Sequence, residues 1–515
     1  MTAGSADSGQ RCLADYISRL LRSEKTADLF GDSSQVLSRN QSEELVDRVA
    51  HAIHARTEQL GRPAMVAIYL PRDNYYLAAI FGSWKSNNHY LPLNQAWPDE
   101  TTRHILQDAQ PDLIISDTGT FQDIAPTLLC ETAATYETPP PTLLRQWQSE
   151  SSGPGIAYVI YTSGSTGGQK GVVISRRSLV SYIEWVERTL GDHRDNRSLL
   201  INGEMSFDIS LADLTFAIAF ETEIHVSPDP RNMLKHAQMV IDRQIDTFYG
   251  VPSTLNRLFS WVETRNGVSL SGLRTIFSGG DVLTTNLVEL LARVAPNAVC
   301  YNMYGPTEVT MNCLYLPVDD EGGKNKDLGS IPTGKEFSHL KYLLVDPDSL
   351  SVEASEGELL VSGDQCMEGY LHDSQRTEQA FVTIDGTRYY RTGDFFTRDV
   401  HGIYTILGRV DSVVKVQGYR VNTNMIDGVL SREPFVREAK TITMRSGEDV
   451  KTITFVSCSK APDDLKAVLT EVCRTKLPRY MIPSHFIEMP ELPQGGTGKV
   501  DTQQLSEIAC ERLLA

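Results

Sequence analysis

A run of hydroxyl, glycine and lysine residues offers the clearest chemistry in this sequence. It follows the apolar segment 157–161 and reads Thr162, Ser163, Gly164, Ser165, Thr166, Gly167, Gly168, Gln169, Lys170. Glycines let successive backbone N–H groups converge on one anion, because no side chain blocks the approach. The hydroxyls add donors and the lysine adds positive charge. The run therefore predicts a phosphate-binding loop.

This loop differs from the commonest phosphate-binding motif. A Walker A loop ends in Gly-Lys-Ser/Thr, whereas Gln169 precedes Lys170 and Gly171 follows it. A second glycine-lysine run, at 495–499, also fails because Val500 follows it. A flexible surface loop is the alternative for any run of this composition. The strand-like segment before the run and the lysine at its end favour phosphate.

The elements around the loop alternate between strand-like and helical patterns. Such alternation predicts βαβ units and mostly parallel sheets, in which ligands bind past the carboxyl ends of the strands. Helices are expected over 12–22 and 40–60. Strands are expected over 64–70, 113–116, 156–161, 199–202, 223–226, 247–249, 275–278 and 298–301.

The length of 515 residues predicts two or more domains. From about Leu340 the pattern becomes strand-rich with short turns, which predicts a β-barrel-like subdomain. We expect a large N-terminal α/β domain over 1–409, with mostly parallel sheets flanked by helices, and a small α+β C-terminal domain over 410–515.

Composition narrows the class of protein. The net charge of −18 argues against nucleic acid as a partner, because phosphate backbones select basic surfaces. The eight cysteines form no CxxC pair, which argues against a zinc ribbon or redox motif. No apolar run is long enough for a membrane helix, and no signal segment starts the chain. These features predict a cytoplasmic protein.

Further motifs join the phosphate loop in a fixed order. They are Phe207-Asp208-Ile209-Ser210, Asn302-Met303-Tyr304-Gly305-Pro306-Thr307-Glu308, Gly357-Glu358-Leu359, Tyr390-Arg391-Thr392-Gly393-Asp394, Gly408-Arg409-Val410-Asp411 with Lys415, Leu477-Pro478-Arg479-Tyr480-Met481-Ile482-Pro483 and Gly498-Lys499. In this order the chain resembles the adenylate-forming superfamily, which includes acyl-CoA synthetases, firefly luciferase and nonribosomal peptide synthetase adenylation domains. The resemblance extends from about Asn40 to Lys499.

The resemblance implies an ATP and Mg²⁺ site. The loop from Thr162 to Lys170 would hold the triphosphate, and the run Asn302, Tyr304, Gly305 would lie at adenine. Thr307 would contact the α-phosphate and Glu308 would hold Mg²⁺. Further along the chain, Asp394 would accept the ribose hydroxyls with Arg409 nearby, and Lys499 would bridge the substrate carboxylate and the α-phosphate.

Within the superfamily the chain looks like an amino-acid-activating member, because Asp208 would pair with a substrate ammonium group. A helix N-cap is the structural alternative for this aspartate. The implied pocket is Asp208, Ile209, Ala212, Gly250, Phe277, Gly279, Met303, Met311, Asn312 and Lys499. It holds no charge facing the substrate side chain, which predicts a neutral amino acid of small to medium size.

The resemblance also implies a second step. The C-terminal domain would be mobile about a hinge at Asp411, bringing Lys415 to the site for transfer to a thiol. The chain ends soon after Lys499 and is similar to D-alanine–carrier protein ligase, so the expected acceptor is the phosphopantetheine of a separate carrier protein. Two alternatives remain: an acyl-CoA synthetase for an amine-free acid, and a catalytically silent scaffold of the same fold.

Overall fold

The computed structural model describes residues 11–163, 169–265, 268–318, 330–353, 355–410, 413–416, 419–446, 449–477, 479–493 and 500–514. The chain divides into two compact units. Unit 1 comprises Met1–Tyr342 and Val361–Tyr390, and unit 2 comprises Leu343–Leu360 and Arg391–Ala515. The domain boundary expected at residue 409 stays a prediction, because the hinge residue Asp411 lies outside the described residues.

The phosphate-loop hairpin belongs to a seven-stranded sheet of unit 1. Its strands, in order across the sheet, are β19 (Gly369–Tyr370), β8 (Gln169–Ser175), β7 (Ile156–Ser163), β4 (His89–Pro92), β3 (Met65–Tyr69), β5 (Leu113–Ser116) and β6 (Thr127–Leu129). From β7 to β6 the neighbours run parallel, while β7–β8 and β8–β19 are antiparallel. The lysine of the loop is therefore a strand residue.

A nine-stranded sheet forms the other half of unit 1. Its strands, in order, are β15 (Lys335–Glu336), β14 (Leu314–Val318), β13 (Val299–Tyr304), β12 (Thr275–Gly279), β11 (Thr247–Gly250), β9 (Ser198–Ile201), β10 (Glu223–Val226), β1 (Asp28–Gly31) and β2 (Val36–Ser38). The five central strands from β13 to β10 are parallel. Their carboxyl ends consequently meet at one edge of the sheet.

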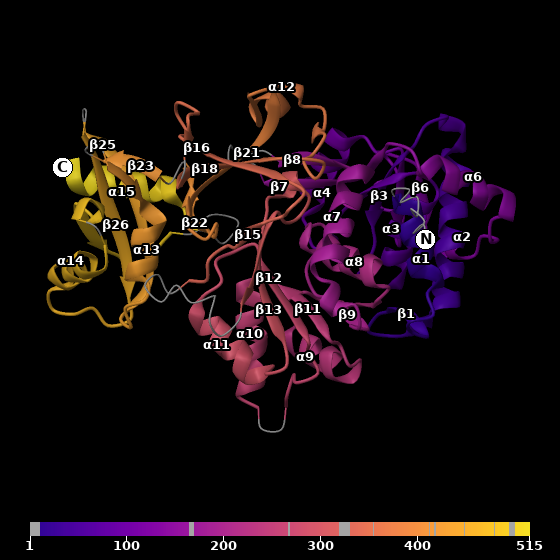
Figure 1. The fold of residues 1–515 in the computed structure, drawn as a ribbon, viewed down its shortest axis with the longest axis horizontal. Coiled ribbons are helices and arrows are strands. Elements are labelled where there is room, and N and C mark those ends of the chain that lie inside the picture. Colours follow the sequence, from indigo (N-terminus) through magenta and orange to yellow (C-terminus); the bar gives the residue numbers. More distant parts are fainter. Residues whose placement is uncertain are drawn as a thin grey trace, which may run out of the picture. The chain divides into compact units, whose positions relative to one another are not determined.

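Helices flank these strands (Figure 1). They are α1 (Leu13–Arg22), α2 (Arg39–Thr57), α3 (Asn74–Lys85), α4 (Asp99–Ala109), α5 (Cys130–Ala134), α6 (Pro141–Ser151), α7 (Arg176–Thr189), α8 (Ile209–Phe220), α9 (Met233–Asp242), α10 (Pro252–Glu263), α11 (Thr285–Val294) and α12 (Ser374–Gln379). Every residue of α8 from Ser210 to Phe220 is buried, as expected for a helix that is apolar on all sides. Such a helix gives Asp208, at its start, a fixed position.

The strand-rich subdomain and the C-terminal segment follow the predicted pattern. Antiparallel strands β16 (Lys341–Val345), β17 (Val352–Glu353), β18 (Glu356–Ser362), β20 (Phe381–Ile384), β21 (Thr387–Arg398) and β22 (Tyr404–Arg409) make up the former. The latter contains strands β23 (Val413–Val416), β24 (Tyr419–Asn422), β25 (Val436–Ser446), β26 (Asp449–Cys458) and β27 (His485–Glu488) with helices α13 (Thr423–Leu430), α14 (Leu465–Lys476) and α15 (Thr502–Leu514). The α/β fold class is confirmed. Among the described helices, none combines the length and apolarity needed to cross a bilayer.

Candidate active site

The predicted phosphate loop joins the two strands of the β7–β8 hairpin. Thr162 and Lys170 face each other across this hairpin. The hydroxyl of Thr162 and the side-chain carbonyl of Gln169 are buried, and neither has a hydrogen-bond partner in the described part of the chain. Buried polar atoms normally have partners. A donor and an acceptor left open at the base of the loop therefore fit a polar ligand there.

Part of the loop lies beyond what the structure describes. Gly164, Ser165, Thr166 and Gly167 are outside the described residues, and Ser163 is described only as the last residue of β7. Their predicted roles stay predictions.

Lys170 forms a compact polar cluster with Glu308 and Tyr370. Its Nζ lies 2.6 Å from Oε1 of Glu308 and donates to the Tyr370 hydroxyl at 2.9 Å. The Tyr370 hydroxyl in turn donates to the same carboxylate oxygen at 2.9 Å. Glu308 is buried, and a buried carboxylate requires such partners. The cluster joins a predicted phosphate ligand and a predicted Mg²⁺ ligand.

Glu308 fits the chemistry of a magnesium site. Mg²⁺ in nucleotide-dependent enzymes is typically held by one or two carboxylates, with phosphate oxygens and water completing its shell. A dedicated cage is absent from the described residues, where no three His, Cys, Asp or Glu side chains group together. One carboxylate beside a phosphate loop suffices for this kind of site.

Asp208 precedes α8 but does not cap it. Its side chain accepts no capping hydrogen bond from the helix, so the N-cap alternative fails on geometry. Burial raises the pKa of Asp208 to about 6; hydrogen bonding to the Thr307 side chain lowers the pKa and the charge of Glu308 raises it. In the described part of the chain, no lysine, arginine or histidine pairs with this carboxylate. The described residues thus supply this carboxylate with no cation.

Several residues of the predicted pocket have apolar side chains. Phe277, Met303, Met311 and Ala212 are buried, as expected for pocket walls. Ile209 is half-buried at the first position of α8. These positions agree with an apolar pocket.

The register of β11 bears on the predicted pocket residue Gly250, whose role stays a prediction. Gly250 pairs with Ser278, whereas Tyr249 pairs with Phe277, and successive strand residues point to opposite faces. A Cβ on Gly250 would meet Leu255 and Phe248, away from the Phe277 face. Tyr249, which the sequence motifs do not include, is the residue of β11 that faces the predicted pocket.

Tyr249 belongs to a buried polar network. Its hydroxyl donates to Oδ1 of Asn312 at 3.0 Å, and Nδ2 of Asn312 donates to the hydroxyl of Tyr182 at 2.9 Å. All three side chains are buried. A Cβ on Gly279 would lie 2.5 Å from the Tyr249 hydroxyl. The Tyr249 hydroxyl therefore occupies the space beside Gly279, a residue of the predicted pocket.

The predicted adenine segment is tightly packed. A Cβ on Gly305 would lie 2.4 Å from the Cα of Asn312, so only glycine fits between Tyr304 and the following turn. The Nδ2 of Asn302 donates to the carbonyl of Pro332 at 2.8 Å. The side-chain amide of Asn302 is thereby oriented by the backbone.

In unit 2, Asp394 and Arg409 pair across β21 and β22. Their Cα atoms are register partners, and Nη1 of Arg409 lies 3.1 Å from Oδ1 of Asp394. The same nitrogen donates to the carbonyl of Thr392 at 2.9 Å. The two predicted ribose-site residues thus come together. Lys499 and Asp411 lie outside the described residues, and Lys415 is described only as part of the backbone of β23.

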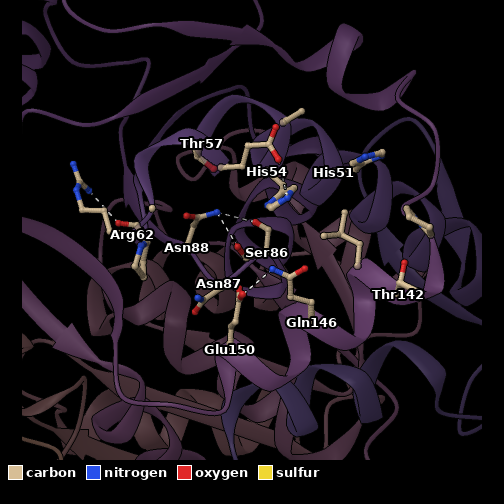
Figure 2. Close-up of a pocket in the computed structure, with 16 residues that line it drawn as sticks. His51, His54, Thr57, Arg62, Ser86, Asn87, Asn88, Thr142, Gln146 and Glu150 are labelled. Carbon is tan, nitrogen blue, oxygen red and sulfur yellow. Dashed lines mark hydrogen bonds and ion pairs between the residues drawn. The ribbon is translucent and has the colours of Figure 1, made fainter.

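A cavity of about 790 Å³ lies beside the residues that precede β3 and β4 in the chain, at the amino ends of these two strands. Figure 2 shows its lining, which includes His51, His54 and the segment 86–88. Ser86 and Asn88 hydrogen-bond internally, the former to the Gly82 carbonyl and the latter to the Ala64 amide. This polar segment therefore serves local structure, and the cavity is separate from the candidate site.

Comparison with known proteins agrees with this arrangement. Residues 21–371 match the family model described as AMP-binding enzyme. Dapdiamide synthesis protein DdaD of Enterobacter agglomerans is 30% identical over 497 residues, covering 94% of this chain and 80% of that protein. The dimodular nonribosomal peptide synthase of Bacillus subtilis is 30% identical over 491 residues, covering 93% of this chain. The chain spans only 20% of the length of that synthase.

Solved structures show the same fold. A four-domain nonribosomal peptide synthetase bound to AMP and glycine superposes with a TM-score of 0.76 at 25% identity, covering 97% of this chain and 36% of that one. The o-succinylbenzoate CoA synthetase of Bacillus subtilis, with its acyl-adenylate, gives a TM-score of 0.77 at 18% identity, covering 95% and 97% of the two chains. The protein belongs to the AMP-binding enzyme family of the adenylate-forming superfamily, whose members activate a carboxylate with ATP.

Proposed function

We propose that this enzyme activates a neutral, small-to-medium amino acid as its aminoacyl adenylate. The observation that carries this proposal is the half-buried Asp208 carboxylate, which has no cation partner in the described part of the chain. A substrate ammonium group supplies the missing positive charge. An amine-free acid bound there would remove water from the carboxylate without compensating its charge, which is costly.

The side chain of the amino acid meets Phe277, Met303 and the tyrosine network. A charged side chain would lose its hydration without gaining a partner there. The Tyr249 hydroxyl over Gly279 limits length, so a small side chain fits this face best. Methionine side chains in the pocket wall adapt to the shape of a ligand, so the pocket accepts a small range of side-chain sizes.

The first step forms a bond between the substrate carboxylate and the α-phosphorus of ATP, and breaks the bond to the departing pyrophosphate. Lys170 and the phosphate loop bind the triphosphate, Thr307 contacts the α-phosphate, and Lys499 orients the attacking carboxylate. Mg²⁺, held by Glu308, would neutralise charge on the phosphates and the leaving group. The residues contribute position and charge rather than a covalent nucleophile.

In the second step a phosphopantetheine thiol of a carrier protein attacks the acyl carbon, releasing AMP and forming a thioester. We propose that the C-terminal segment turns about Asp411 between the steps and brings Lys415 to the site, a recognised mode of switching. The relatives support a carrier-protein acceptor, because nonribosomal peptide synthetases are among them.

Amino-acid-dependent ATP–pyrophosphate exchange tests the proposal. We expect exchange with neutral small-to-medium amino acids, and none in the Lys499→Ala variant. Asp213→Asn is the control for Asp208→Asn, because Asp213 is a buried carboxylate on α8, the helix that Asp208 precedes, and lies outside the proposed contacts. Fastest exchange with lysine or glutamate would reject the substrate class. Thioester formation with CoA and an amine-free acid, unaffected by Asp208→Ala, would indicate an acyl-CoA synthetase instead.

A further inference from the structure

We propose that Tyr370 is a positioning residue that orients Glu308 for the metal and Lys170 for the phosphates. This inference rests on the proposed function of those two side chains. The Tyr370 hydroxyl donates to Oε1 of Glu308 and accepts from Nζ of Lys170, both at 2.9 Å. The same Nζ lies 4.5 Å from the centre of the Tyr370 ring. The Tyr370 hydroxyl therefore contacts both charged groups, and the Tyr370 ring also faces the ammonium group of Lys170.

Strand pairing fixes the position of this hydroxyl. Tyr370 lies on β19 and pairs with Val172 of β8, two residues beyond Lys170. The Tyr370 amide donates to the Thr377 hydroxyl at 2.8 Å, and the next amide, that of Leu371, donates to the carbonyl of Gly171 at 2.8 Å. Tyr370 is 7% exposed. Its backbone and ring are held, so the hydroxyl has little freedom to leave the carboxylate.

Orientation of the carboxylate matters because magnesium requires near-ideal octahedral geometry and exchanges its water reluctantly. A carboxylate held by a fixed donor loses less side-chain freedom when the metal binds. Conversely, Lys170 must turn from Glu308 to reach a phosphate. The Tyr370 hydroxyl remains with Glu308 through that change and prevents the carboxylate from losing all its partners.

The molecule contains a second cluster of the same chemistry. The Tyr16 hydroxyl donates to Glu187 at 3.0 Å, and Nη2 of Arg19 lies 2.6 Å from the same carboxylate. Arg19 also lies 5.0 Å from the Tyr16 ring centre. This cluster joins α1 to α7 and contains no residue of the candidate site. Tyr16→Phe therefore removes an equivalent hydroxyl at a structural position.

Manganese binding separates positioning from structure. The probe is Mn²⁺, followed by electron paramagnetic resonance, titrated into the full chain with a non-hydrolysable ATP analogue. We expect Tyr370→Phe to weaken Mn²⁺ binding roughly tenfold, since it removes a hydrogen bond to a charged group. Tyr16→Phe should bind Mn²⁺ like the wild type. Both variants should lower the midpoint of thermal unfolding by similar amounts.

Two results would overturn the inference. One is wild-type Mn²⁺ affinity in Tyr370→Phe. The other is a midpoint for Tyr370→Phe lower than that of Tyr16→Phe by more than about 5 °C, a difference that marks a mainly structural residue. Failure of the wild type itself to bind Mn²⁺ and the ATP analogue would instead reject the proposed ATP and metal site.

Discussion

The half-buried Asp208 and the buried Glu308 are two carboxylates of one unit with opposite surroundings. Glu308 is paired with Lys170 and hydrogen-bonded to Tyr370. Asp208 has the Thr307 side chain as a hydrogen-bond partner and, among the described residues, no cation. The negative charge of Glu308 is therefore balanced by Lys170 before any ligand binds, whereas the negative charge of Asp208 has no balancing cation among the described residues. In the proposed function, the metal and triphosphate must rearrange an existing ion pair, whereas the amine of the substrate forms a new one.

Removal of the Asp208 charge should have the largest effect on activity. Asp208→Asn should reduce kcat/KM for the amino acid roughly 100-fold, because a charge-assisted contact to the ammonium is lost. The same change should raise thermal stability, since burial opposes the charged carboxylate in the free protein. Exchange kinetics and thermal unfolding measure the two effects. Loss of stability together with unchanged kinetics would contradict the assignment.

Removal of Lys170 should act on stability in the opposite direction. Lys170→Met leaves Glu308 buried without its cation, and we expect the free energy of unfolding to fall by about 2 kcal/mol. The double variant Lys170→Met with Glu308→Gln should recover part of that loss, because no unpaired charge remains. Denaturant titration of both variants checks the sign. Equal stability of the single and double variants would show that the pair is not coupled.

The pH dependence of KM sharpens the comparison. The pKa of Asp208 is about 6, so the carboxylate is charged above that pH and protonated below it. An ammonium contact that needs the charge is thus complete above pH 6 and is lost as the pH falls. We expect KM for the amino acid to rise about tenfold per pH unit below 6. Asp208→Asn should flatten this limb of the profile.

The smallest of these effects concerns the pocket face. Gly279→Ala places a Cβ within 2.5 Å of the Tyr249 hydroxyl and 3.0 Å of the Met303 carbonyl. Because Tyr249 is held by Asn312, we expect the substitution to raise KM for the amino acid about fivefold and leave KM for ATP unchanged. Gly61→Ala, at an open surface turn, is unsuitable as a control because its φ is positive. Gly191→Ala, with open space around it and no such φ, is the matched variant.

Much of the sheet arrangement is predictable because apolar strand patterns and strand ends are local signals. The strand over 113–116 is predicted to the residue. The strand expected over 298–301 runs from Val299 to Tyr304, so only Gly305 to Glu308 of the following motif lie beyond its end. Lys170 is expected within a loop but belongs to strand β8. The expectation differs because the start of this antiparallel strand carries the end of the phosphate-loop motif and has no strand-like pattern. The pocket role of Gly250 stays a prediction, because sequence order does not say which face of a strand lines the pocket.

The tyrosine contacts have no usable signal in the sequence. Tyr182 meets Asn312 across 130 positions and Tyr370 meets Lys170 across 200 positions. Such pairs arise from the way two sheets and a helix pack, and neither propensity nor spacing encodes them. The hydrogen-bonding partner of a buried tyrosine is a tertiary property.

The glycine between Tyr304 and the Asn312 backbone has a consequence for engineering. With only 2.4 Å between a hypothetical Cβ and the Cα of Asn312, the turn proposed to face the nucleotide and the proposed floor of the amino acid pocket share one contact surface. Redesign of position 312 for a new substrate would shift the neighbouring turn as well. Specificity changes in this enzyme are therefore better sought at Ala212 or Phe277, on separate elements, than at the floor.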